Sequence, residues 1–187
     1  PTPNPKPTPN PTPGWALDLG AGPAVGVLPQ AAAALRLSVD IVGRHWAAGA
    51  GAMTVLPRQL DLGPDATAVV QLWSGAAFGC FVGRLPKRGS VTFPICGGLH
   101  AGAMIGRGRG SSLRTAQGTT AWVAAGLSAK VRWHGARRVG AFAGLEGLAP
   151  LRRPSFVVGG FGRVCCQNPV SLLVTAGLSV GRAPRVR

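Results

Sequence analysis

Three histidines are the first residues that could carry chemistry in this 187-residue chain. His45, His100 and His134 could each act as a general acid or base if a carboxylate or a nucleophile lay within reach. No carboxylate accompanies His100 in the local sequence, and the other two lie beside short connections. We therefore expect hydrogen-bonded structural histidines and no catalytic activity.

Four cysteines offer metal binding or disulfide formation as further chemistry. Cys165 and Cys166 are adjacent and lack the spacing of zinc ligand pairs, so we expect no metal or other cofactor. An even number of cysteines without metal-ligand spacing is typical of an oxidising compartment. Cys80 and Cys96 flank a short basic turn and are the preferred disulfide pair. Four cysteines allow three pairings, however, and free buried thiols remain the alternative.

Arginines supply most of the net charge of +15, which comes from 20 Lys and Arg against 5 Asp and Glu. Arg107 and Arg109 alternate with glycines, but the segment lacks the context of a phosphate-binding loop. With Arg152 and Arg153 they could contact a polyanion such as the phosphates of lipopolysaccharide, or simply be solvated. Tyrosine is absent and the arginines fall between apolar stretches, so we expect no nucleic-acid partner.

The elements that position these residues follow from an alternation of apolar and polar residues after Trp15. It is clearest over 170–181, with Leu173 as the exception, and over 121–133. Stretches of about ten residues are long enough for a tilted strand to cross a bilayer. Eight strands are expected, at 15–27, 35–42, 45–56, 69–82, 94–107, 121–133, 139–148 and 170–181.

The expected connections alternate in length along the chain. Those near 43–44, 85–90 and 135–138 are compact, whereas 108–120 and 149–168 form longer loops. No apolar run is long enough for a membrane-spanning helix. An even number of strands, with short turns on one rim and longer loops on the other, predicts a closed antiparallel up-and-down eight-stranded transmembrane β-barrel.

The two faces of these strands would then have opposite environments. In a membrane barrel the apolar face points to lipid and the polar face into the lumen. An eight-stranded lumen is filled by side chains, so no open pore is expected, and buried charges must be paired. The alternative is a soluble basic β-protein that binds polyanions such as nucleic acid, with its polar face in water. The membrane hypothesis predicts a lumen ion-pair network of Asp18, Arg36, Asp40, Lys130, Arg132 and Glu146.

The region 15–182 resembles the short outer-membrane β-barrel domains of bacterial envelope proteins. The resemblance is strongest to uncharacterised ones from arginine- and alanine-rich genomes such as those of myxobacteria. It rests on three stretches: PTPNPKPTPNPTP, FGCFVGRLPKRGSVTFPICGGLHAGAMIGRGRG and SLLVTAGLSVGR. It implies a bacterial outer-membrane location, contact with membrane lipids and lipopolysaccharide, and an anchoring, structural or adhesive role. In such families a turn flanked by two cysteines precedes a glycine-rich strand, which corresponds to Cys80, Cys96, Gly97, Gly98 and Gly102.

The first fourteen residues differ in composition from the rest. Proline occupies nearly every second position, which predicts a stiff polyproline II arm of about 40 Å. We therefore expect two parts, a periplasmic linker over 1–14 and the barrel over 15–187. A linker of this kind predicts an upstream periplasmic domain, and the barrel itself is expected to be a monomer.

Overall fold

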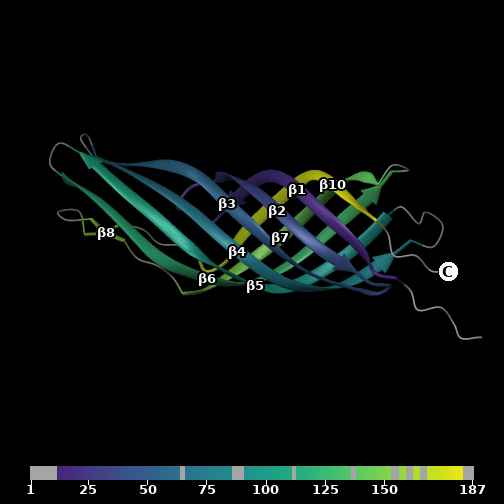
Figure 1. The fold of residues 1–187 in the computed structure, drawn as a ribbon. Helices are drawn as coiled ribbons and strands as arrows, with labels where there is room; N and C mark the ends of the chain where they lie inside the picture. Colours follow the sequence, from purple (N-terminus) through teal and green to yellow (C-terminus); the bar gives the residue numbers. More distant parts are fainter. Residues whose placement is uncertain are drawn as a thin grey trace, which may run out of the picture.

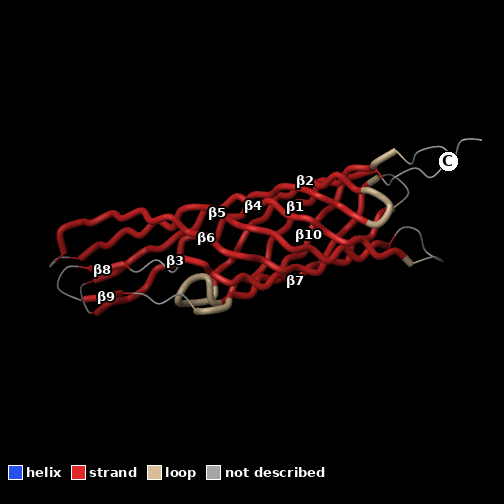
Figure 2. The backbone as a smooth tube through the Cα atoms, turned by 90° about the horizontal axis from the view of Figure 1, so that it is seen from below, coloured by secondary structure: helices blue, strands red, loops and turns tan. Residues whose placement is uncertain are grey.

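The computed structural model describes residues 12–63, 66–85, 91–110, 113–135, 138–152, 156–158, 162–164 and 168–182. Its regular structure is entirely β, as Figures 1 and 2 show. No helix among these residues is long and apolar enough to cross a membrane. The strands are β1 (Gly14–Val25), β2 (Ala32–Val42), β3 (Trp46–Gly63), β4 (Ala66–Arg84), β5 (Val91–Gly110), β6 (Leu113–His134), β7 (Val139–Arg152), β8 (Phe156–Val158), β9 (Gly162–Val164) and β10 (Ser171–Arg182).

Eight of these strands close into one barrel. Each pairs antiparallel with its neighbour along the chain, in the order β1 to β7 and then β10. The first and last barrel strands close the cylinder, with Leu17 opposite Val180 and Leu19 opposite Leu178. Closure leaves the barrel wall without an unpaired edge. The expected closed, antiparallel, up-and-down eight-stranded barrel is confirmed.

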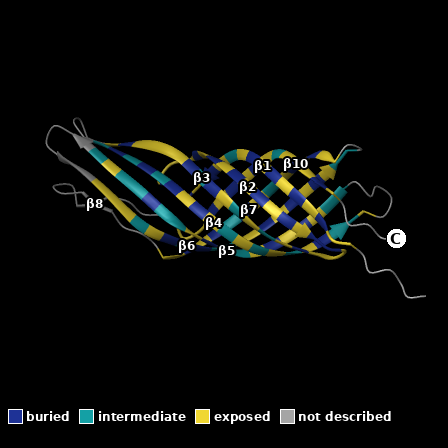
Figure 3. Cartoon of the chain, viewed as in Figure 1, coloured by how far each residue is buried: buried dark blue, intermediate teal, exposed yellow. Residues whose placement is uncertain are grey.

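The barrel is apolar outside and charged inside. Along β2, Val39 and Ile41 are 51% and 55% exposed, whereas Arg36 and Asp40 are 6% and 3% exposed. Figure 3 shows the same alternation of buried and exposed residues on the other barrel strands. A soluble β-protein would show the opposite distribution, so that alternative is wrong. The outward residues include Leu172, Val174, Leu178 and Val131.

Four strands are longer than the sequence predicted. β3 to β6 contain 18 to 22 residues, whereas β1, β2, β7 and β10 contain 11 to 14. Pairing of β2 with β3 stops at Ala34 and Val55, and pairing of β6 with β7 stops at Val123 and Arg152. The four long strands continue beyond these points as a sheet, which we call the extension; it projects to the left in Figure 1. The expected loop over 108–120 is therefore wrong, because β5 and β6 occupy most of it.

A register shift marks the start of the extension on β3. It falls between Val55 and Arg58, where Pro57 interrupts the strand. Proline lacks a backbone N–H and is tolerated in sheets at edges and bulges. Pro57 lies just past the last residue that pairs with β2, where β3 becomes an edge strand. A β-bulge typically bends a strand and increases its twist, and pairing of β3 with β4 resumes at Arg58 and Val70.

The connection before the last barrel strand contains a short hairpin that the sequence analysis missed. β8 and β9 pair with each other and not with the barrel. Three-residue strands are too short to show a periodic pattern. Cys165 and Cys166 follow this hairpin and lie outside the described residues.

A smaller correction concerns the end of the first strand, because β1 ends at Val25 and Val27 is buried.

The two rims of the barrel differ. The start of β1, the end of β10 and the connections that follow β2, β4 and β6 lie at one end, which we call the terminal rim. The connections that follow β1, β3, β5 and β7 lie at the other end, the loop rim. Thr12 and Pro13, the described end of the proline-rich arm, are exposed. Residues 1–11 lie outside the described part, so the linker over 1–14 stays a prediction.

Candidate functional site: the charged lumen

The alternation of side chains along the strands explains why the charged residues point into the lumen. On β1, β2, β6 and β7 the even-numbered residues of the barrel wall face inward, because side chains alternate along a strand. All six side chains of the expected network lie on these four strands and are at most 6% exposed. We call this set, together with His100, the charged layer. Its members are Asp18, Arg36, Asp40, His100, Lys130, Arg132 and Glu146.

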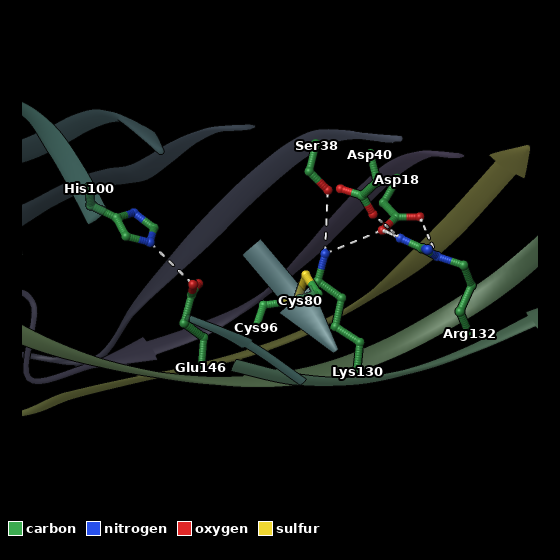
Figure 4. Close-up of a disulfide and its surroundings, with 9 residues drawn as sticks. All are labelled: Asp18, Ser38, Asp40, Cys80, Cys96, His100, Lys130, Arg132 and Glu146. Atoms are coloured by element: carbon green, nitrogen blue, oxygen red, sulfur yellow. Dashed lines mark hydrogen bonds and ion pairs between the residues drawn. A yellow bond between two sulfur atoms is a disulfide. The ribbon is translucent and has the colours of Figure 1, made fainter. Parts of the chain in front are cut away.

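The group nearer the terminal rim centres on two aspartates. Arg132 bridges Asp18 and Asp40, and its Nε lies 3.1 Å from Asp18 Oδ1. Lys130 Nζ lies 3.4 Å from Asp18 Oδ2 and 3.5 Å from Ser38 Oγ. These residues come from β1, β2 and β6, and Figure 4 shows their side chains directed toward one another. Two carboxylates and two cations therefore neutralise one another within a buried cluster.

A second group lies nearer the loop rim. Arg36 forms a buried ion pair with Glu146 across the lumen. Glu146 Oε1 also lies 3.2 Å from His100 Nε2. Gly126 leaves space for this histidine, because a Cβ there would lie only 3.1 Å from Nε2. The sequence analysis left His100 out of the network, although its position in the middle of a strand with lumen-facing parity was a usable signal.

Aromatic rings line the same cavity. Lys130 Nζ lies 5.4 Å from the ring centre of Phe78 and 5.9 Å from that of Phe142. His100 meets Trp122 edge to face, with ring centres 6.2 Å apart. A desolvated cation above an aromatic face is attracted by the quadrupole of the ring. The rings of Phe78 and Phe142 therefore stabilise the Lys130 cation as well as filling space.

Apolar residues close the lumen on both sides of the charged layer. Toward the terminal rim, Ala16, Val42, Ala47 and Val82 form one buried cluster. Toward the loop rim, a larger cluster follows, which we call the apolar layer. Water and ions therefore meet packed side chains on either side of the charges. The apolar layer includes Met53, Val55, Leu72, Met104, Trp122, Leu148 and Leu173.

A disulfide joins two neighbouring strands inside the lumen. Cys80 on β4 and Cys96 on β5 stand directly opposite each other, and their sulfur atoms are bonded. Cys96 is buried, and Cys80 packs against the apolar cluster at the terminal rim. The preferred pairing from the sequence is confirmed.

Two of the four surface arginines expected to contact polyanions have described side chains. Arg107 lies on β5 within the extension, Arg152 ends β7, and both are exposed. Arg109 belongs to β5, but its side chain is outside the described part, as is all of Arg153. The structure adds Arg58, an exposed residue of the extension on β3.

The other two histidines do not join the charged layer. His45 is exposed in the connection between β2 and β3, and His134 ends β6 in a half-buried position. Among the described residues, no group of three His, Cys, Asp or Glu side chains could hold a metal ion. The chemistry of this site is therefore ion pairing and hydrogen bonding within a packed interior.

Solved structures share this architecture. A major outer membrane protein from Thermus thermophilus aligns with a TM-score of 0.66 at 10% identity, over 91% of this chain and 100% of that chain. Ail, the attachment invasion locus protein of Yersinia pestis, aligns with a TM-score of 0.58 at 10% identity, over 91% and 99%. The N-terminal β-barrel domain of Pseudomonas aeruginosa OprF gives a TM-score of 0.52 at 9% identity, over 92% and 100%.

These similarities define the fold class. The chain has the fold of the eight-stranded β-barrels of the bacterial outer membrane. Neither a protein-family model nor a curated protein matches the sequence. The resemblance to outer-membrane barrels is confirmed at the level of fold. These neighbours come from Thermus, Yersinia and Pseudomonas, so the narrower myxobacterial affiliation finds no support.

Proposed function

We propose that this chain is a bacterial outer-membrane anchor that presents a basic sheet at the cell surface. One observation carries the proposal: the barrel exposes leucine, valine and isoleucine outside and buries its ion pairs inside. An apolar exterior of this size in water would drive aggregation, whereas acyl chains solvate it. The filled lumen supports a structural or adhesive role without an open pore, and the proposal includes no catalytic step.

The orientation follows from the two rims. Bacterial outer-membrane barrels have short periplasmic turns and longer extracellular loops. The terminal rim has the short connections, such as 43–45, whereas the loop rim has the extension and the β8–β9 hairpin. The terminal rim would therefore face the periplasm. The arm over 1–14 would lie there and lead to an upstream domain.

The extension is the part proposed to contact other surfaces. Arg58, Arg107 and Arg152 are exposed at this end of the molecule. Guanidinium groups bind phosphate and sulfate in a two-pronged geometry. One structural neighbour, Ail, was crystallised in complex with the heparin analogue sucrose octasulfate, and that structure aligns with a TM-score of 0.57. We infer that the ligand here is a polyanionic glycan, such as lipopolysaccharide, that carries phosphate or sulfate groups.

The anchoring role is tested by the state of the full chain in membranes. A folded barrel should fractionate with outer membranes and migrate faster on a detergent gel before boiling than after it. It should also resist unfolding in urea while it stays in lipid or detergent. A chain that purifies as a soluble monomer without detergent would contradict the proposal.

The surface role is tested separately with heparin and purified lipopolysaccharide as probes. Replacing Arg58, Arg107 and Arg152 together by glutamine should weaken binding roughly tenfold and flatten its salt dependence. The matched control replaces three arginines of the terminal rim, Arg44, Arg138 and Arg182, by glutamine. Equal losses in both variants would show that only total charge matters and would refute a role for the extension.

A further inference from the structure

The terminal rim carries a group of arginines that the charged lumen and the extension do not involve. Arg44 lies between β2 and β3, Arg84 ends β4, Arg138 precedes β7 and Arg182 ends β10. Arg44, Arg138 and Arg182 are exposed, and Arg84 is half-buried. These positions are distributed over most of the rim, because β7, β10, β1, β2, β3 and β4 are six consecutive strands of the eight around the barrel.

The backbone holds these arginines in defined places. Arg84 Nη2 donates a hydrogen bond to the Gly43 carbonyl at 2.9 Å, which connects it to the turn that contains Arg44. The Gly181 N–H donates to the Arg138 carbonyl at 2.9 Å, which connects Arg138 to the end of β10. The backbone next to Arg44 and the backbone of Arg138 are therefore each held by a hydrogen bond.

Arg138 has an unusual backbone conformation. Its φ of 66° is the only positive value of a non-glycine residue in the described chain. Glycine or asparagine adopts this left-handed region at lower cost than other residues. A local preference for turn geometry would therefore favour glycine, yet the sequence places a long cation there.

No acidic residue balances this charge among the described residues of the rim. Asp18, Asp40 and Glu146 point into the lumen, where they are already paired. Asp61 lies in the extension at the opposite end. In the sequence, Asp65 falls between β3 and β4, which meet at the loop rim, and its placement is not described. The arginines therefore form a positive surface without internal counter-charges.

Exposed aromatic residues accompany the arginines. Trp15 is the second residue of β1 and Trp46 the first of β3, both at this rim, and they are 45% and 53% exposed. Trp133 lies near the end of β6 and is 54% exposed. Trp15 stands directly opposite Arg182 across β1 and β10. Tryptophan concentrates at the level of lipid headgroups, so these rings place the arginines at the same depth.

We propose that the terminal rim binds the phosphate groups of anionic phospholipids, such as phosphatidylglycerol, in the periplasmic leaflet. This inference rests on the orientation in the proposed function. Each guanidinium matches a phosphodiester by two-pronged hydrogen bonding, and a tryptophan at the same depth would contact the glycerol and upper acyl region. Zwitterionic lipids offer the same phosphate but carry an ammonium group, which the cationic rim repels.

The experiment uses the full chain folded into phosphatidylcholine vesicles with and without phosphatidylglycerol. Brominated acyl chains quench tryptophan fluorescence on contact, so quenching by brominated phosphatidylglycerol and brominated phosphatidylcholine gives their relative affinity at the protein surface. We expect a roughly tenfold preference for phosphatidylglycerol. Trp122 is fully buried in the lumen and adds an unquenched background, and Trp73, 53% exposed on β4 toward the loop rim, adds quenching that does not report on the terminal rim.

Two matched variants identify the surface. Replacing Arg44, Arg138 and Arg182 by glutamine should abolish the preference. Replacing Arg58, Arg107 and Arg152 removes the same charge at the other end and should leave it unchanged. No preference in the parent chain, or equal loss in both variants, would overturn the proposal.

Other experimental outcomes would distinguish failure of this inference from failure of the proposed function. If the rim variant loses binding to isolated peptidoglycan while its lipid preference persists, the partner is the cell wall and the lipid proposal is wrong. If the parent chain does not insert into vesicles, as judged by heat-modifiable migration, the proposed function fails. Insertion without lipid preference refutes only the inference about the rim.

Discussion

The charged layer and the apolar layer fill the same lumen by different means. In the charged layer, partners from opposite walls meet across the barrel, as Arg36 of β2 and Glu146 of β7 do. In the apolar layer, Leu72, Leu148 and Leu173 are fully buried and carry no charge. Ion pairs require specific partners, whereas apolar packing requires matching volume. The charged layer is therefore expected to be more sensitive to the identity of single residues.

The largest expected effect comes from Asp18→Ala. Arg132 would keep its ion pair with Asp40, whereas Lys130 would lose its ion pair with Asp18 and be left buried beside Ser38. Breaking a buried ion pair on one side costs about 3–5 kcal/mol. The midpoint of urea unfolding in detergent, followed by gel migration, measures the loss. Asp61→Ala, which removes an exposed carboxylate from the extension, should change stability by less than about 0.5 kcal/mol.

Leu72→Ala tests the apolar layer by opening a cavity. The side chain is fully buried, so its truncation should cost about 2–5 kcal/mol. The matched control is Leu127→Ala, which removes the same atoms from an outward side chain that is 67% exposed. The control should cost less, because no internal cavity forms. Equal losses in urea unfolding would mean that the apolar layer does not stabilise the barrel by packing.

Gly126→Ala tests how tightly the charged layer is packed. The added methyl group would press on His100 Nε2, the atom that contacts Glu146. Inserting one methyl into a filled site costs about 1–3 kcal/mol. Gly97→Ala is the control, since nothing lies within 4 Å of a Cβ there. An equal response of the two variants in urea unfolding would argue against close packing around His100.

The smallest effect is expected from converting part of one layer into the other. Glu146→Leu alone removes the carboxylate that pairs with Arg36 and should be strongly destabilising. Combined with Arg36→Met it removes both charges, and the double variant should lie within about 1–2 kcal/mol of the parent. A double-mutant cycle of unfolding free energies measures the recovery. A double variant as unstable as Glu146→Leu would mean that the ion pair itself is needed for the closed barrel.

The sequence predicted most of the barrel wall because lipid and lumen are opposite environments. Each strand in the wall must alternate between the two environments, and burial alternates along the whole of β2 and β10. The sequence did not predict the extension, because beyond the barrel the two faces of a strand no longer lie in lipid and in a closed lumen. Its outer face carries Gln59, Asp61 and Arg107, and the alternation that identifies a membrane strand is lost there.

The six charged residues of the expected network could be predicted from the sequence, but the ion pairs that they form could not. Parity along the strands identified the six charged residues as one inward-facing set, and the turn between Cys80 and Cys96 indicated their disulfide. Which carboxylate meets which cation depends on the register of strands far apart in the chain. Asp18 and Arg132, for example, are 114 residues apart.

The local sequence pattern therefore predicted the strands, since apolar and polar residues alternate with a two-residue period along them. The outward direction of the apolar face, which distinguishes a membrane barrel from a soluble β-protein, was decided by the tertiary structure. Tertiary structure decided where β3 to β6 extend beyond the barrel wall. It also placed His100 beside Glu146 and four arginines at the terminal rim. These features depend on barrel closure, which brings together residues that are far apart in the chain. Contacts of this kind produce no periodic pattern in the sequence.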